Sequence, residues 1–337
     1  MIDVLVAGAG PVGLVFAISA AAAGLEVRVL DPRTAPIDKA CGEGLMPEAV
    51  AQLALLGVDP QGVDFAGIRY IAPGHSVVAH FAGGHGRGVR RTVLQAQLHA
   101  RAVELGVQFA EDRVTHVVQF DDRIQAGDWS ARHIVGADGL HSQVRAALGL
   151  SVSAGPGPRY GIRQHWAVAP WTDVVEVYWL PDAELYVTPV DEETVGIAVL
   201  GPAPLDLHSS IAKVPALAHR LRGAHAVSSI RGAGPMHAQV ARRWAGRALL
   251  IGDAAGYVDA LTGEGLRIGF AQARAAVDAI VSDDLASYER EWHRITRSYR
   301  LLTSSLLFCA RRRPLRKALV PAAQAMPFAF RQIVNLL

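Results

Sequence analysis

The segment from Val4 to Asp31 constrains the fold most strongly, because it carries no charge between Val4 and Leu25. Its sequence, VLVAGAGPVGLVFAISAAAAGLEVRVLD, fits an export signal, a membrane anchor or the first elements of an α/β domain. An export signal requires a basic leader, whereas the only early charge here is Asp3. The glycines near its start would interrupt a membrane-spanning helix. We therefore interpret the segment as a strand, a glycine turn and a helix.

The glycines of this segment each have a physical role in such a unit. Residues 2–7 are rich in β-branched side chains and suit a strand buried on both faces, as in a parallel sheet. Gly8 permits the tight turn, and Gly10 lets the backbone approach a pyrophosphate. Gly13 lets the helix pack closely against the strand.

The ends of the helix and of the next strand complete the signature of a dinucleotide site. Pro11 and Val12 begin the helix, whose N-terminal amides and dipole favour an anion. The next strand ends at Asp31, whose carboxylate can take both hydroxyls of an adenosine ribose. Pro32 and Arg33 follow directly, and we include them among the predicted contacts.

Composition excludes several other classes of protein. Hydrophobic residues make up 51% of the 337 residues and charged ones 19%, which indicates an ordered globular chain. The formal charge of +2 is too small to indicate a nucleic-acid partner. The two cysteines, Cys41 and Cys309, offer no disulfide framework and fit a reducing cytoplasm. The 13 histidines lack ligand spacing, so no metal site is predicted.

Strands alternate with helices at both ends of the chain and surround a strand-rich middle. The predicted fold is α/β, α+β overall, with a Rossmann-like domain on a parallel sheet, an antiparallel-sheet substrate domain and C-terminal helices. Strands at 161–168, 174–180, 184–190 and 194–200 predict the antiparallel sheet. We expect the first domain to comprise residues 1–70, 88–155 and 236–290. The second domain would comprise 71–87 and 156–235, with the chain crossing between the domains at 154–158. Residues 291–337 would form an amphipathic helical region.

Two further glycine–aspartate motifs, GADG at 136–139 and GDAAG at 252–256, each follow an expected strand of the first sheet. The carboxyl ends of such strands surround one crevice, so a single large cofactor could touch all three motifs. Asp253 would reach the hydroxyls of a ribityl chain. The helix start around Gly263, Glu264, Gly265 and Leu266 would place its amides under the electron-rich edge of a flavin ring.

With these motifs the chain resembles, over nearly its whole length, the FAD-dependent monooxygenase superfamily of para-hydroxybenzoate hydroxylase type, together with its geranylgeranyl-reductase branch. The resemblance implies FAD on the N-terminal domain, held by the residues named above. Arg91, in RTVLQAQL, matches the family arginine that contacts the flavin side chain. Asp138 matches the aspartate of the DG motif, and Asp253 that of the GD motif.

Different segments of the chain point to different branches of this superfamily. The segments DKACGEGLMP at 38–47 and GDAAGYVDALTGEGL at 252–266 are similar to segments of the reductase branch. However, ELYVTP at 184–189 lacks the tryptophan of the reductase signature and offers Tyr186 instead. The WxWxIP motif of the halogenase branch is absent.

The segment around Cys41 supplies the candidate catalytic residues. Gly42 and Gly44 would let the backbone pass close to the isoalloxazine, leaving Cys41 and Glu43 beside the reacting carbon, where either could transfer a proton. Cys41 and Gly42 are also expected to contact the cofactor. The alternative is an ordinary glycine turn with a buried thiol and an exposed carboxylate. Substrate contact is a weaker hypothesis for the sheet residues Arg163, His165 and Trp166, whose alternative is a solvent-facing position.

Only one dinucleotide fingerprint is present, so NADPH or NADH is expected to visit transiently and reduce FAD. We expect monooxygenation, by hydroxylation or epoxidation, of a hydrophobic aromatic or isoprenoid-like molecule. The alternative is reduction of a carbon–carbon double bond, and a flavin-binding scaffold or a halogenase ranks lower. The basic amphipathic C-terminal region would pack on the protein itself or on a second subunit, or make peripheral contact with a membrane. The expected location is therefore cytoplasmic, with possible membrane association.

Overall fold

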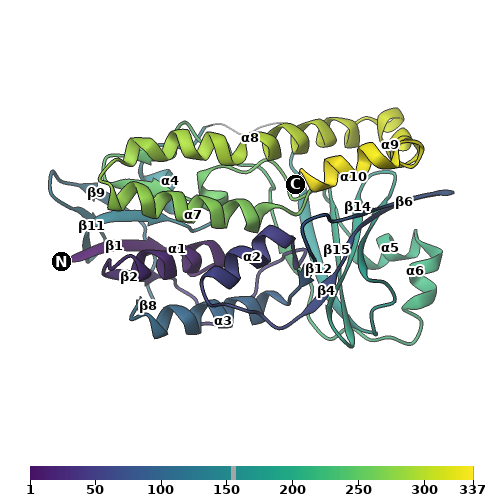
Figure 1. Cartoon of the computed structure of the whole chain (residues 1–337), viewed down its shortest axis with the longest axis horizontal. Coiled ribbons are helices and arrows are strands. Elements are labelled where there is room, and N and C mark those ends of the chain that lie inside the picture. Colours follow the sequence, from purple (N-terminus) through teal and green to yellow (C-terminus); the bar gives the residue numbers. More distant parts are fainter. Residues whose placement is uncertain (153–156, 337) are drawn as a thin grey trace.

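The structure is a computed structural model that describes residues 1–152 and 157–336. It contains a largely parallel sheet, an antiparallel sheet and a layer of helices that runs along both (Figure 1). The first three residues of the predicted crossing at 154–158 lie outside the described part of the chain.

The first sheet has the strand order β17-β18-β11-β1-β2-β8 and carries β10 and β9 on β11. The strands β1, β2, β8, β11 and β18 run parallel, whereas β17, β10 and β9 add antiparallel pairs. Their bounds are Ile2–Ala7 for β1, Val27–Leu30 for β2, Gln108–Ala110 for β8, Val117–Gln119 for β9, Ile124–Ala126 for β10, Trp129–Gly136 for β11, Trp244–Ala245 for β17 and Ala248–Leu250 for β18.

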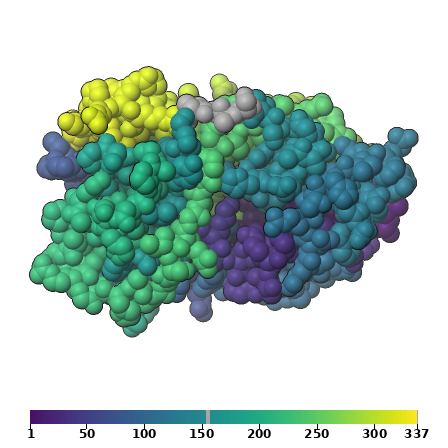
Figure 2. Space-filling model, turned by 180° about the vertical axis from the view of Figure 1, so that it is seen from behind, coloured from purple at the N-terminus to yellow at the C-terminus, as the bar shows by residue number. Residues whose placement is uncertain are grey.

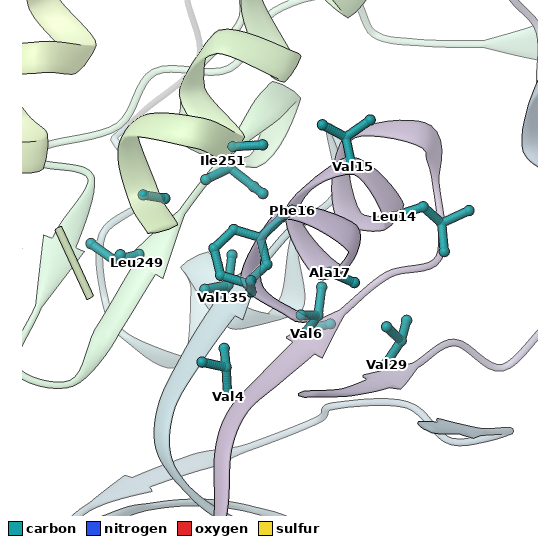
Figure 3. Packing of buried hydrophobic residues seen from close by; sticks show 14 of the residues in the cluster. Val4, Val6, Leu14, Val15, Phe16, Ala17, Val29, Val135, Leu249 and Ile251 are labelled. Carbon is teal, nitrogen blue, oxygen red and sulfur yellow. The ribbon is translucent and has the colours of Figure 1, made fainter. Parts of the chain in front are cut away.

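The predicted strand, turn and helix at the N-terminus are confirmed by β1 and by α1 (Pro11–Ala22). Figure 3 shows why this unit is stable: Phe16 of α1 lies over Val4 and Val6 of β1 and over Val135 and Leu249 of neighbouring strands. All five side chains are buried. Burial of each such side chain contributes about 1.5–3 kcal/mol, which explains the uncharged run in the sequence.

The second sheet has the order β16-β12-β15-β14-β13-β5-β6. Its bounds are Arg231–Ala233 for β16, Tyr160–Ala167 for β12, Thr194–Gly201 for β15, Glu184–Asp191 for β14, Val174–Trp179 for β13, Gly67–Ala72 for β5 and His75–His80 for β6. The four predicted strands correspond to β12, β13, β14 and β15. The expected antiparallel pattern has one exception, because β5 pairs parallel to β13. Strand β5 also extends across the predicted domain boundary at residue 70.

The remaining elements connect and cover these sheets. A small sheet of β3 (Gly44–Leu45), β7 (Gly86–Gly88) and β4 (Val63–Phe65) lies between them, near α2 (Pro47–Leu55) and α3 (Arg91–Glu104). The short helices α4 (Gln143–Ala147), α5 (Leu207–Ala212), α6 (Pro215–Arg220) and η1 (Gly252–Ala255) follow strands or loops. The helical layer consists of α7 (Gly265–Val281), α8 (Leu285–Ala310), α9 (Arg313–Ala325) and α10 (Pro327–Asn335) (Figure 1).

The C-terminal helices pack on the protein with one face. Helices α9 and α10 contact β6, and α9 also contacts β5. Val320 of α9 and Phe330 of α10 are buried in a cluster with Tyr70 and Trp179 of the second sheet. This apolar face therefore covers the antiparallel sheet, as expected if the region packs on the protein itself.

Candidate active site

One cavity of about 570 Å³ reaches from the glycine turn after β1 to the antiparallel sheet. Seen from behind, the surface is hollowed where the green and teal segments meet near the purple N-terminal residues (Figure 2). The strands β1, β11 and β18 lie in one sheet, so the motifs that follow them reach the same edge. All three motifs contribute to the cavity wall, through Gly8, Gly10, Pro11, Val12, Ala137, Asp138, Gly139, Gly252 and Asp253.

The glycines of the first motif differ in what surrounds them. A Cβ on Gly13 would lie 2.1 Å from the carbonyl oxygen of Gly8, so the helix and turn can be this close only with glycine there. A Cβ on Gly10 would meet only Arg91 Nη2, at 3.8 Å, and one on Gly42 would meet nothing within 4 Å. Gly10 and Gly42 line the cavity, so the space beside them suits a bound cofactor.

Asp31 lines the cavity, and its ionised carboxylate accepts several hydrogen bonds. Its carboxylate accepts hydrogen bonds from the Ala9 amide at 2.9 Å and from Arg33 Nε and Nη2, both at 2.9 Å. Burial opposes ionisation, but the bonds from Arg33 and Ala9 outweigh it and hold the pKa of Asp31 below its usual value. Arg33 is 53% exposed, so it can release the carboxylate to a ribose. Pro32 also lines the cavity.

Arg91 and Asp138 both face the cavity with unpaired polar atoms. Arg91 begins α3, and its buried Nε has no hydrogen-bond partner among the described residues. Asp138 Oδ2 accepts from the amides of Gln143, at 2.7 Å, and Val144, at 3.2 Å, and so caps α4. Its buried Oδ1 lacks a partner within the described chain. A polar cofactor would satisfy both orphan atoms.

Asp253 projects from η1 and lies 3.9 Å from Lys39 Nζ. The carboxylate is 30% exposed and lines the cavity, as does Lys39. Lys39 was not among the residues predicted to contact the cofactor. The only available signal was its position two residues before Cys41, within the segment that resembles the reductase branch.

Glu43 is buried, so the alternative of an exposed carboxylate was wrong: only 3% of the residue is exposed. Its Oε2 lies 2.6 Å from His165 Nε2, and its Oε1 accepts the Arg91 amide at 2.8 Å. Arg163 Nη2 lies 3.6 Å from Oε1 and 2.6 Å from Asp38. The backbone of Glu43 has φ 61°, the left-handed region that non-glycine residues rarely adopt. These contacts fix the loop against α3 and the second sheet.

The other predicted residues near the Glu43 loop do not all reach the cavity. Cys41 and Gly42 line the cavity, and Cys41 Sγ accepts the Glu43 amide at 3.4 Å. Arg163 also lines the cavity, whereas His165 lies behind Glu43. Trp166 packs on the opposite side, near His208, because successive strand residues point to opposite faces.

The residues at the start of α7 lie partly in the cavity wall and partly in the protein interior. Gly263, Gly265 and Leu266 line the cavity, but Glu264 does not. Its carboxylate pairs with Arg267 Nη2 at 2.6 Å, and burial raises its pKa to about 7. Glu264 is therefore placed to support the helix start from inside the protein.

The far end of the cavity is apolar. Tyr186 donates its hydroxyl to the Leu261 carbonyl at 2.9 Å, and the ring of Tyr70 packs against those of Trp179 and Phe330. Burial raises the pKa of both tyrosines, so they are neutral phenols. The other apolar lining residues include Ile68, Val175, Val177, Ala198, Leu200, Met236 and Val334.

Comparison with known proteins identifies the cofactor. The family described as FAD binding domain matches residues 89–282, more than half of the chain. This chain belongs to that family. It is similar to the menaquinone reductase of Mycobacterium tuberculosis (strain CDC 1551 / Oshkosh), with 30% identity over 320 residues, which cover 84% of this chain and 78% of the relative. The FAD-binding family member described here is thus an FAD-dependent oxidoreductase of the monooxygenase and geranylgeranyl-reductase superfamily.

Two further similarities agree. Digeranylgeranylglycerophospholipid reductase 2 of Methanopyrus kandleri is 27% identical over 329 residues, covering 86% of this chain and 82% of the relative. The structure of a flavoprotein/dehydrogenase from Cytophaga hutchinsonii superimposes with a TM-score of 0.79 at 18% identity and covers 92% of this chain and 86% of that one. The predicted fold is therefore confirmed. FAD is the cofactor, and NAD(P)H is the reductant typical of the family.

Proposed function

We propose that this chain reduces a carbon–carbon double bond in a lipophilic molecule with an isoprenoid chain, such as a quinone or a lipid. The observation that carries this proposal is that one continuous cavity joins the three glycine motifs to an apolar end. An apolar end of this kind suits a hydrocarbon chain. The named relatives, a menaquinone reductase and a digeranylgeranylglycerophospholipid reductase, support this substrate class.

The residues around the cavity suit FAD in the orientation that the motifs predict. Asp31 with Pro32 and Arg33 would hold the adenosine end. The Val12 amide and the dipole at the start of α1, which begins at Pro11, would hold the pyrophosphate. Arg91 and Asp253 would hold the central part of the cofactor, and the start of α7 the flavin ring. FAD, once bound and reduced, supplies a hydride.

Among the two candidate catalytic residues, Cys41 has the freer side chain. Both carboxylate oxygens of Glu43 are already engaged in hydrogen bonds, Oε1 with the Arg91 amide and Oε2 with the His165 ring. Cys41 lines the cavity, and its sulfur engages only a long bond from the Glu43 amide. We therefore assign Cys41 as the proton donor for double-bond reduction and Glu43 as the residue that positions the loop.

Product analysis tests this proposal. The FAD-loaded protein, given NADPH or NADH and a menaquinone with an unsaturated side chain, should yield a product that has gained two hydrogens, measured by mass spectrometry. Cys41→Ala should retain FAD but slow this step by about 10²-fold. A product with one added oxygen and substrate-accelerated reoxidation in air would instead support the monooxygenation expected from the sequence.

We also propose that the outer face of the C-terminal helices rests on an anionic membrane surface, from which a lipophilic substrate reaches a cytoplasmic enzyme. No helix within the described residues is long and apolar enough to cross a membrane. Phe328 is 73% exposed, and the other exposed apolar residues of α9, α10 and the residues beside them are Leu315, Met326, Ile333 and Leu336. The sequence from Arg297 onward contains no Asp or Glu, so its basic residues complement anionic lipid.

The geometry of α10 connects this surface to the cavity. Val334 lines the cavity, while Phe328, Ile333 and Leu336, on or next to the same helix, are exposed. One helix therefore separates the cavity from the proposed lipid surface. A short path for an apolar substrate follows from this arrangement.

Vesicle sedimentation tests the membrane contact. The protein should sediment with vesicles that contain phosphatidylglycerol and much less with pure phosphatidylcholine vesicles. Phe328→Ser should weaken this binding, whereas the matched change at Leu55, which is 70% exposed on α2, should not. Equal binding by both variants would count against this surface.

A further inference from the structure

A second cavity, of about 420 Å³, lies on the other side of η1 and opens between α7, α8 and the segment that precedes β17. Its wall includes His237, Arg243, Trp292 and Arg300. Asp253 also lines it, so one carboxylate borders both cavities. No step of the proposed reduction uses this second space.

Two ring nitrogens at this cavity lack a partner. Trp292 is only 2% exposed, and its Nε1 has no acceptor within the described chain. The neighbouring ring atom Cζ2 lies 3.6 Å from where a Cβ on Gly256 would be, so this edge of the indole lies beside Gly256, which also lines the cavity. His237 Nδ1 lies 3.4 Å from the Val258 carbonyl, and its buried Nε2 is unpaired among the described residues. Buried polar atoms without partners are uncommon in proteins.

Two guanidinium groups lie against the same indole. The Arg243 guanidinium is 3.8 Å from the centroid of the Trp292 ring, and that of Arg300 is 5.0 Å away. Arg243 is compensated by Glu289, with 3.2 Å between Nε and Oε1. Arg300 is exposed and forms no ion pair with any residue the structure describes. Its charge is therefore left for a ligand.

The remaining charges do not cancel this excess. Asp253 is the carboxylate in the wall, and it faces Lys39 at 3.9 Å on the side of the first cavity. His293 also lines the second cavity and lies 3.4 Å from Glu289. The free donors are an indole N–H and guanidinium N–H groups, so a matching ligand would carry oxygen atoms that accept hydrogen bonds. Arginine groups bind phosphate oxygens particularly well.

We infer that this second cavity binds a small phosphate-bearing molecule, with Arg300 as its main charged contact and Trp292 Nε1 as a buried donor. The inference does not depend on which reaction occurs in the first cavity. Free phosphate and a nucleotide share the required chemistry. Binding of either is expected to change the affinity for FAD, because Asp253 lies between the two sites.

The test uses the protein saturated with FAD, so that the first cavity is filled. Calorimetric titrations at constant ionic strength with inorganic phosphate, ADP and NADP⁺ should show binding of at least one probe. Arg300→Ala should weaken that binding at least tenfold. Arg297→Ala, an equally exposed change on α8 outside the cavity wall, should leave it within twofold.

The probes also identify the source of the phosphate. Binding of phosphate alone would indicate a free anion, and binding of ADP or NADP⁺ without phosphate would indicate a nucleotide. Either result supports the site if Arg300→Ala removes it. No binding of any probe, or equal affinity in Arg300→Ala and the unaltered protein, would overturn the inference and leave a cavity filled only by water.

Discussion

Removing the Glu43 carboxylate should destabilise the protein strongly, even though the residue lies in a loop. In Glu43→Ala the Arg91 amide loses its acceptor, His165 Nε2 loses a contact of 2.6 Å, and the nearly fully buried Arg163 loses one of its two carboxylates. The perturbation therefore affects α3, the loop and the second sheet together.

The contacts set the size of the effect. Removing one partner of a buried ion pair costs about 3–5 kcal/mol. Arg163 keeps Asp38 at 2.6 Å, so we expect the lower end, about 3 kcal/mol. Glu43→Gln keeps an acceptor for the Arg91 amide and loses only the charge, so we expect about 1–2 kcal/mol.

Urea unfolding of the FAD-free protein, followed by circular dichroism, measures these differences in the free energy of unfolding. Glu192→Ala removes an exposed carboxylate from the turn between β14 and β15 and should change stability by less than about 0.5 kcal/mol. If Glu43→Ala were as stable as Glu192→Ala, the carboxylate would not hold the loop. Its role as a positioning residue would then be refuted.

Three further predictions concern α7, the glycine turn after β1 and the loop that contains Gly42. Burial raises the pKa of Glu264 from 4.5 to about 7, so its contribution to stability is complete below pH 4.5 and falls by about 3 kcal/mol as the pH rises to about 7. Glu264→Gln should flatten that part of a plot of unfolding free energy against pH, and an unchanged slope would contradict the prediction. Gly13→Ala should lower stability by about 1–3 kcal/mol or more, because its Cβ would collide with the Gly8 carbonyl. Gly42→Ala should leave the stability of the FAD-free protein unchanged but weaken FAD binding, and fluorescence titration with FAD checks this contrast.

The sequence predicted the fold well wherever side-chain periodicity or turn chemistry decides the outcome. The uncharged strand and helix at the N-terminus, and the four strands of the middle region, were placed within a few residues of their observed bounds. Neither β5 nor β6 was predicted as a strand of the second sheet, although residues 71–87, which contain β6, were assigned to the second domain. The pairing of β5 with β13 bridges about a hundred residues of sequence, so no local pattern predicts it, and β6 joins the sheet through its pairing with β5.

The candidate site was predictable in part for a similar reason. Residues that follow parallel strands must meet at one edge, so Gly10, Asp138 and Asp253 could be grouped from motifs alone. The partners of Glu43 could not be, since His165 and Arg163 approach it from another sheet. Lys39 and the apolar end of the cavity likewise depend on how the two sheets are packed together.

The convergence of three motifs on one FAD molecule is the central claim, and an FAD titration tests it most directly. Flavin fluorescence quenching on the FAD-free protein should show one FAD bound per chain. Asp31→Ala, Arg91→Ala and Asp253→Ala should each weaken binding at least tenfold while the circular dichroism spectrum stays unchanged. A protein that takes up no FAD, or that binds it equally well in all three variants, would contradict the account.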